Sequence, residues 1–287
     1  MNYRKLITNT KSTRDFHEKK IPESIIREVL EYSNNVESLI PQQSISINYI
    51  SDGEEAYNKL QGIAGYHGIM IKAPQYLLFL SDNLENHQIN VGYFVEDIIL
   101  KLSEKEVDTC WINIPEDGEI VKLALGITDN MEAAALVAIG YDKNEIKVVN
   151  QVSVGDNYSK SDLKIVENNI STRLNVEEIL YLDKWGNNIS IDKLIDLGLH
   201  DIFHYAVMAP STLNRQPWRF ILRDKLLIIA IRNDENINNE LDLLDSGIIM
   251  LFIQIMMKES NIQGKWTLSE LKDEKIPDNY RVIGYFS

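Results

Sequence analysis

The sequence contains one arrangement twice, and this repetition constrains the fold more than any other feature of the chain. Gly92 precedes Trp111 by nineteen residues, and Gly247 precedes Trp266 by the same interval. Both intervals open with apolar residues at helical spacing. The chain has only 4 tryptophans, so chance is a poor explanation of the shared order. The sequence therefore predicts a duplicated unit.

A second ungapped match lies upstream in each copy. It aligns residues 29–32 with 202–205 and places Gln43 opposite Gln216. Each copy also contains an Ile-Gly-Tyr strand pattern, at 137–141 and 281–285. Both copies contain segments with apolar residues at helical spacing and segments with apolar residues at strand spacing. This mixture is typical of an α+β fold.

These patterns predict two units, 1–186 and 187–287, with a polar insertion at about 142–170 in the first. The second unit is the shorter one. The expected helices are 23–33, 88–103, 115–125, 190–207 and 240–260, and the expected strands are 46–50, 75–81, 134–141, 218–222 and 226–232, followed by a final strand.

A rigid polar junction, residues 210–218, separates a helical run from a strand in the second unit; we call it the elbow. Pro210 and Pro217 bracket short polar side chains, so the backbone there must be extended or turning. Polar junctions of this kind bind ligands more often than they pack.

The two copies differ in their polar segments. The first begins with a basic segment, Lys11–Phe16, that has no counterpart before Ser190 in the second. The elbow occurs only in the second copy, where the first has Glu37–Gln43 instead. Each copy therefore retains a feature that the other lacks.

Composition excludes several partners. The net charge of −14 argues against nucleic acid or an anionic membrane surface. The single cysteine, Cys110, fits a reducing compartment. The longest apolar run, 247–257, is too short to span a bilayer, and the first residues carry no apolar signal segment. We expect a cytoplasmic protein.

These motifs resemble those of the flavin-dependent nitroreductase superfamily. Its Arg-Arg-Ser-x-Arg-x-Phe motif is similar to the basic segment, with Thr10 in place of the first arginine. Its Pro-Ser-x-x-Asn-x-Gln-Pro-Trp motif matches the elbow at every fixed position. A glycine-containing helix before Cys110-Trp111-Ile112 and a closing segment from Arg173 add to the resemblance. The chain looks most like a single-chain subgroup with two fused nitroreductase-like units.

The resemblance implies a nitroreductase-like α+β fold that forms an internal pseudo-dimer, with FMN as cofactor. In the homodimers of the superfamily, the two motifs at one flavin come from different subunits. A chain that carries each motif once would therefore keep one complete site and act as a monomer.

The resemblance also implies roles for individual residues. The basic segment and Arg173 would bind the phosphate, the elbow would line the flavin, and the backbone after the Cys-Trp-Ile sequence would face its N5 edge. The implied cofactor-binding residues are Lys11, Ser12, Arg14, Ile112, Asn113, Arg173, Pro210, Ser211, Thr212 and Asn214.

The implied activity is hydride transfer from NAD(P)H through FMN to a nitroaromatic, a quinone or a similar flat electrophile. It requires no catalytic side chain and no metal, and we interpret the helical pair His200 and His204 as structural. Two alternatives remain open. Many family members have glycine where this chain has Asn113 and Ile114, so the protein could bind FMN with little turnover. The second alternative is a degenerate nitroreductase fold that serves as an interaction scaffold.

Overall fold

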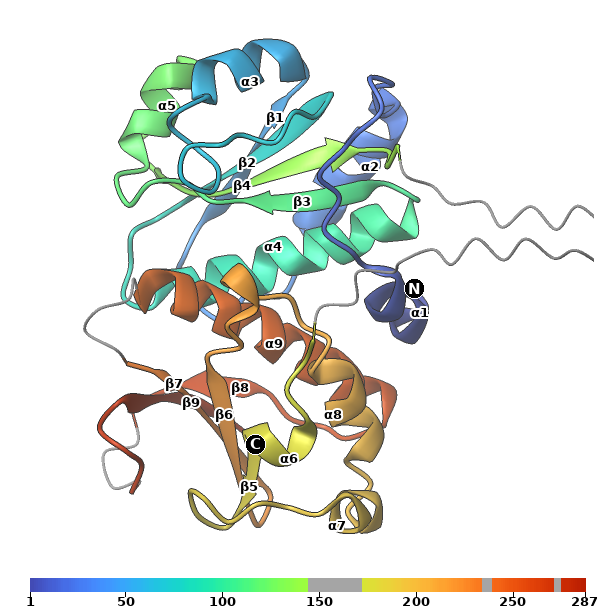
Figure 1. The fold of residues 1–287 in the computed structure, drawn as a ribbon, viewed down its shortest axis with the longest axis vertical. Helices are drawn as coiled ribbons and strands as arrows, with labels where there is room; N and C mark the ends of the chain where they lie inside the picture. Colours follow the sequence, from blue (N-terminus) through green and yellow to red (C-terminus); the bar gives the residue numbers. More distant parts are fainter. Residues whose placement is uncertain (144–171, 234–238, 271–274) are drawn as a thin grey trace, which may run out of the picture.

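Two β-sheets lie on opposite sides of two long helices, α4 (His87–Glu104) and α9 (Asn239–Glu259), in the computed structural model (Figure 1). The structure describes residues 1–143, 172–233, 239–270 and 275–287. The expected insertion at 142–170 therefore falls almost entirely outside the described residues. Within these ranges, no helix combines the length and hydrophobicity needed to cross a bilayer.

The first sheet is antiparallel and has the strand order β1-β2-β4-β3. Its strands are β1 (Ile45–Ile50), β2 (Gln75–Ser81), β3 (Asp108–Ile112) and β4 (Glu132–Gly140). Side chains of β2 alternate between two cores: Leu77 and Phe79 pack in the cluster that contains α4, and Leu78 and Leu80 pack in another. Three shorter helices accompany the sheet: α2 (Glu23–Ser33), α3 (Gly53–Leu60) and α5 (Glu119–Leu125).

The second sheet has the order β5-β6-β7-β9-β8. Its strands are β5 (Leu180–Leu182), β6 (Trp218–Arg223), β7 (Leu226–Arg232), β8 (Trp266–Leu268) and β9 (Tyr280–Phe286). Strand β5 runs parallel to β6, and the other pairs are antiparallel. The helices of this half are α6 (Val176–Ile179), α7 (Ile191–Asp196) and α8 (His200–Ala206), with α1 (Tyr3–Asn9) packed against α4 and α8.

Apart from β5, the two sheets share their strand order and also their register. Strand β1 pairs with β2 so that Ile45 lies opposite Ser81, and β6 pairs with β7 so that Trp218 lies opposite Ile231. A register shift follows Phe79 in β2 and falls at the corresponding place, after Ile229, in β7. These positions agree with the sequence match that sets Gln43 opposite Gln216.

The Ile-Gly-Tyr patterns, by contrast, are not structurally equivalent. Trp111 lies opposite Val137 and Trp266 lies opposite Phe286. The counterpart of Val137 is therefore Phe286, not the Arg281 that a match of 137–141 with 281–285 would require. Strand register is set by the pairing of residues across the sheet. Three shared residue types in a row do not reveal that pairing.

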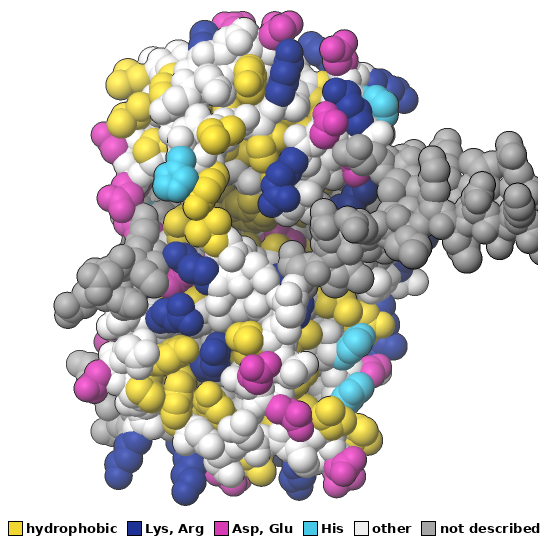
Figure 2. Space-filling view, in the orientation of Figure 1, with side chains coloured by type: hydrophobic (Ala, Val, Ile, Leu, Met, Phe, Trp, Pro, Cys, Tyr) yellow, Lys and Arg dark blue, Asp and Glu magenta, His cyan; other side chains and the backbone are white. Residues whose placement is uncertain are grey.

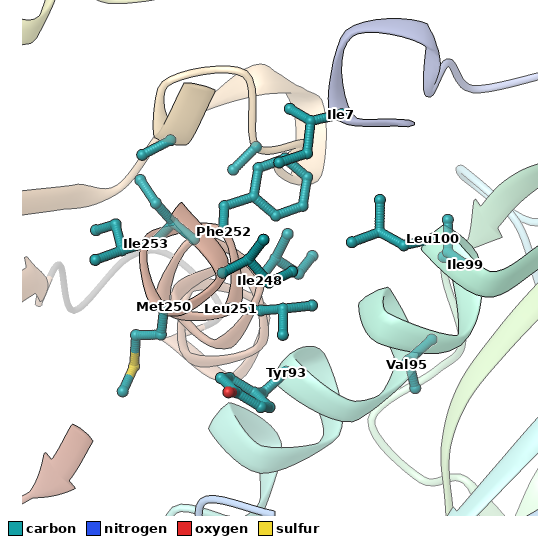
Figure 3. Close-up of a cluster of buried hydrophobic side chains, with 14 of the residues drawn as sticks. Ile7, Tyr93, Val95, Ile99, Leu100, Ile248, Met250, Leu251, Phe252 and Ile253 are labelled. Carbon is teal, nitrogen blue, oxygen red and sulfur yellow. The ribbon is translucent and has the colours of Figure 1, made fainter. Parts of the chain in front are cut away.

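Helices α4 and α9 cross closely because each has a glycine at the contact. A Cβ atom on Gly92 would lie 2.0 Å from the carbonyl oxygen of Leu244, and one on Gly247 would lie 1.9 Å from that of Ile89. The two contacts are mirrored, since each partner residue lies three positions before the other glycine. Around the crossing, side chains of both helices and Ile7 of α1 form one buried cluster (Figure 3).

The expected helix over 190–207 is wrong, because the chain forms α7 and α8 with a break between them. Gly198 has a φ of +70°, its amide bonds to the carbonyl of Ile195, and the Leu199 amide bonds to that of Leu194. This is a glycine C-cap that ends α7. The expected helix at 115–125 begins only at Glu119 and ends before Gly126 as predicted.

Buried carboxyl groups lie on α4 beside β3 and α2. The Trp111 indole N–H donates to Glu96 Oε2 at 3.0 Å, and the Tyr32 hydroxyl donates to Asp97 at 3.2 Å. Burial raises the pKa of Glu96 to about 7 and that of Asp97 to about 6. The folded protein therefore holds protons here that the unfolded chain releases.

We expect the free energy of unfolding to fall as the pH rises from about 4.5 to about 7, because the folded state binds more protons across this window. Glu96 alone contributes on the order of 3 kcal/mol to this loss. Urea unfolding at several pH values measures it. Glu96→Gln should flatten the profile, whereas Glu85→Gln, at an exposed position, should not. An unchanged profile for Glu96→Gln would contradict the assignment.

Gly92→Ala and Gly247→Ala should each destabilise the fold, because the new methyl group would overlap a backbone carbonyl of the facing helix. Overpacking of this kind costs about 1–3 kcal/mol or more. Thermal unfolding measures the effect, with Ser103→Ala in α4 as a control. Since the contacts are mirrored, losses that differ greatly between the two glycines would argue against an equivalent crossing.

Candidate functional site

The elbow forms a tight turn between α8 and β6. Residues Thr212–Asn214 make one 3-10 turn, and Leu213, Asn214 and Gln216 have φ angles of 52°, 56° and 48°. Left-handed conformations of this kind cost a non-glycine residue about 1–3 kcal/mol and persist only where the surroundings enforce them. The predicted turning backbone is confirmed.

Helix α9 holds the start of the elbow. The Thr212 amide donates to both carboxylate oxygens of Asp245, at 3.0 and 2.9 Å, and the Thr212 hydroxyl donates to Oδ1 at 3.1 Å. Ser211 Oγ accepts the Gln216 amide at 3.0 Å. Burial raises the pKa of Asp245 to about 7, and the hydrogen bonds from Thr212 oppose that shift.

Residues 172–174 hold the other side of the elbow. Arg173 Nη1 donates to Asn214 Oδ1 at 2.5 Å, and Asn214 Nδ2 donates to the Thr172 carbonyl at 2.7 Å. The Leu174 amide donates to Gln216 Oε1 at 2.8 Å. Burial lowers the pKa of the Arg173 guanidinium. Gln216 is buried beside this segment, so its side chain anchors the turn.

The basic segment runs alongside β3 in the first half. Ser12 forms a parallel bridge with Thr109, and the Thr13 amide donates to the Thr109 carbonyl at 2.9 Å. Burial raises the pKa of the Cys110 thiol to about 11, against the opposing charge of the nearby Arg14. Cys110 is therefore a buried, protonated thiol.

The side chains of the basic segment differ in their partners. Lys11 Nζ pairs with Asp142 Oδ2 at 2.5 Å, while Ser12 and Arg14 are exposed. Among the described residues, the buried hydroxyl of Thr13 has no hydrogen-bond partner. Of the two cations in the basic segment, Lys11 is held by Asp142, and Arg14 is the one whose side chain faces solvent.

The predicted backbone site lies at the end of β3. Ile112 is buried and pairs with Leu136 of β4, and Asn113 follows with an exposed side chain. The Asn113 carbonyl accepts the Gly65 amide at 2.7 Å. The loop after α3 therefore fixes the position of this backbone.

The predicted residues fall into two groups. The β3 group contains Lys11, Ser12, Arg14, Ile112 and Asn113, and the elbow group contains Arg173, Pro210, Ser211, Thr212 and Asn214. The β3 group lies along β3 of the first sheet, and the elbow group lies against α9. Figure 2 shows the surface hollowed between these two parts of the molecule, with Lys and Arg side chains above and below the hollow. Arg173 belongs with the elbow rather than with the other cations.

A separate pocket lies elsewhere, between β1, the start of α3 and the segment after α5. It is lined by residues 48–52, Glu55, Ala56, Lys59, Leu125 and Ile127. None of the predicted site residues lines it.

Sequence reasoning missed Asp245, the acceptor that holds the elbow. A signal was present, because Asp245 precedes Gly247 by two residues as Asn90 precedes Gly92. What the sequence could not show is that both side chains turn toward the segment before the first strand of their own half.

The sequence matches a family described as "Putative TM nitroreductase" over residues 2–257. The chain belongs to this nitroreductase family. Its fold is similar to that of a "putative nitroreductase" from Thermotoga maritima MSB8, with a TM-score of 0.56, 17% identity, and coverage of 99% of this chain and 93% of that one. The fold is therefore nitroreductase-like.

Weaker similarities involve shorter proteins. A nitroreductase with bound FMN from Bacteroides fragilis NCTC 9343 is 16% identical, with a TM-score of 0.43, over 58% of this chain and 100% of that one. An FMN-dependent nitroreductase from Clostridium difficile R20291 is 18% identical, with a TM-score of 0.41, over 57% and 98%. No curated protein matches the sequence.

Proposed function

We propose that this protein is an FMN-dependent NAD(P)H oxidoreductase, and that FMN lies between the β3 group and the elbow group. The observation that carries the proposal is the placement of two complementary motifs, each present once, on two halves with the same strand order and register. The membership of the nitroreductase family supports it.

The two halves are, in this proposal, fused nitroreductase-like units that form an internal pseudo-dimer. Three features support it: the mirrored glycine contacts of α4 and α9, the equivalent strand pairs, and the equivalent tryptophan positions. Strand β5 falls before the proposed boundary at 186 but pairs with β6 of the second sheet. The end of the first unit thus reaches across to the second, which ties the halves together.

The donor set fits FMN in part. The exposed guanidinium of Arg14 and hydroxyl of Ser12 suit a phosphate. The Ser211 hydroxyl keeps its proton for a ligand, since its oxygen accepts the Gln216 amide. Lys11 is paired with Asp142, so Arg14 carries more of the phosphate recognition than the sequence indicated.

The polar side chains of Thr212 and Asn214 are already used to brace the elbow. In the proposal, the elbow therefore lines the cofactor with Pro210 and with its backbone rather than with these side chains. The position of Asn113 is set by its bond to Gly65, which keeps the backbone at the end of β3 in a fixed place. Such preorganised edges orient a cofactor.

The chemistry that FMN supplies when bound is hydride transfer at its N5 atom, from NAD(P)H to a nitroaromatic, a quinone or a similar flat electrophile. The chain's residues would hold and orient the cofactor. Because the net charge is −14, the field of the whole protein repels an anionic nicotinamide donor. Local cations, above all Arg14, must offset that repulsion.

The purified protein should contain about one FMN per chain. The basic segment and the elbow each occur once, so they can form only one complete site. Flavin absorbance after denaturation, divided by protein concentration, measures this ratio. Two flavins per chain would contradict the single-site proposal. Under anaerobic conditions, NADH or NADPH should bleach the visible flavin absorbance. A bound flavin that neither donor reduces would indicate a binding protein instead of an enzyme.

Arg14→Ala should weaken FMN binding by about 10- to 100-fold, the equivalent of one charge-assisted hydrogen bond to phosphate. Fluorescence quenching on titration of FMN measures the dissociation constant. Arg27→Ala, which removes an exposed arginine from α2, is the matched control and should bind FMN like the wild type. An equal affinity for Arg14→Ala and Arg27→Ala would remove Arg14 from the site.

A further inference from the structure

Each long helix uses one buried side chain to hold the segment before one of the two equivalent strands, β1 and β6. On α9, Asp245 accepts the Thr212 amide at 2.9 and 3.0 Å. On α4, Asn90 Oδ1 accepts the Leu39 amide at 2.7 Å. The match of Gln43 with Gln216 sets Leu39 opposite Thr212, and the match of the two glycines sets Asn90 opposite Asp245. The same brace therefore exists twice.

The neighbouring hydroxyl is also matched in kind. Thr212 Oγ1 donates to Asp245 Oδ1 at 3.1 Å, and Ser38 Oγ lies 3.1 Å from Asn90 Oδ1 and 2.8 Å from the Ile40 carbonyl oxygen, its alternative acceptor. Both brace side chains are buried, with 1% exposure for Asp245 and 0% for Asn90. The first half thus shows that an amide oxygen is sufficient to accept the braced backbone amide.

The braced segments differ in backbone strain. Leu213, Asn214 and Gln216 in the elbow have positive φ angles. The matching segment of the first half, residues 37–43, is fully described and has none. Strained backbone clusters at functional sites, and neighbouring contacts must hold it. Only the brace on α9 therefore acts on a segment that carries such strain.

We propose that Asp245 is a positioning residue for the cofactor: it holds the Thr212 amide and so fixes the elbow in its ligand-binding shape. This inference rests on the proposed FMN site. Asn90 makes the same bonds in a half that lacks the elbow motif, so it supports the fold without serving the cofactor. The chain therefore contains its own control for a structural role.

Charged neighbours of Asp245 come from two elements. Asp242, one turn earlier on α9, raises the pKa of Asp245, and Arg215 of the elbow lowers it. Arg215 Nη2 pairs with Asp242 Oδ1 at 2.6 Å. These two charges oppose each other beside the brace. The positioning role is assigned to the hydrogen bonds that Thr212 donates, not to the charge of Asp245. In the first half an uncharged acceptor, Asn90, holds the matching backbone amide.

The test compares Asp245→Ala, Asp245→Asn and Asn90→Ala in the full chain, with FMN affinity and thermal unfolding measured for each. Asp245→Ala should weaken FMN binding by about tenfold or more, because it releases a part-buried backbone amide and the strained turn. Asp245→Asn should restore the affinity to within about threefold of the wild type, since the amide oxygen accepts the same bonds. Asn90→Ala should lower the unfolding temperature and leave the affinity unchanged.

Three results would overturn the inference: wild-type affinity in Asp245→Ala, no rescue by Asp245→Asn, or an equal loss of affinity in Asn90→Ala. If Asp245→Ala does not fold, Asp245→Ser removes the carboxylate while keeping a polar group at the buried position, and the same comparison applies. A wild-type protein that binds no FMN would contradict the proposed function itself. Wild-type binding that Asp245→Ala leaves intact would overturn only the positioning role.

Discussion

The close crossing of α4 and α9 is the contact on which the rest of the structure depends. Gly92 and Gly247 allow each helix backbone to approach the carbonyl of the other, and no side chain larger than hydrogen fits at either place. The crossing buries apolar side chains from both helices in one shared core. The halves consequently cannot separate without exposing that core, and the surface between them keeps a fixed shape.

That shared frame is what the proposed site needs if two unequal halves are to contribute to it. In the proposal, the first half would supply Arg14 and the end of β3, and the second would supply the braced elbow. Residues 172–174 join the elbow through Arg173 and Leu174. The equivalent segment of the first half kept its brace at Asn90 but has no strained turn. Both halves therefore share a scaffold, whereas each polar motif is present in only one half.

Local patterns predicted the elements that tertiary packing does not modify. The helix at 23–33 and the strand at 75–81 have the predicted bounds, and α4 and α9 agree within a residue or two. The break at Gly198 was missed, because a glycine in a helical pattern ends a helix only if the chain turns there. Strand β3 is absent from the strands expected from the sequence, since its ladder with β4 involves residues more than twenty positions away.

The sequence alone determined the matched spacing of two segments, the asymmetry of the polar motifs and the family that they resemble, because these depend only on residue identity and spacing. Tertiary structure decided which of these side chains are paired with other residues of the fold. Lys11 lies against Asp142, Arg173 lies against the elbow, and Asp245 reaches Thr212 across thirty-three residues. Such contacts join segments that are far apart in the chain, so residue spacing carries no information about them until the helices have packed.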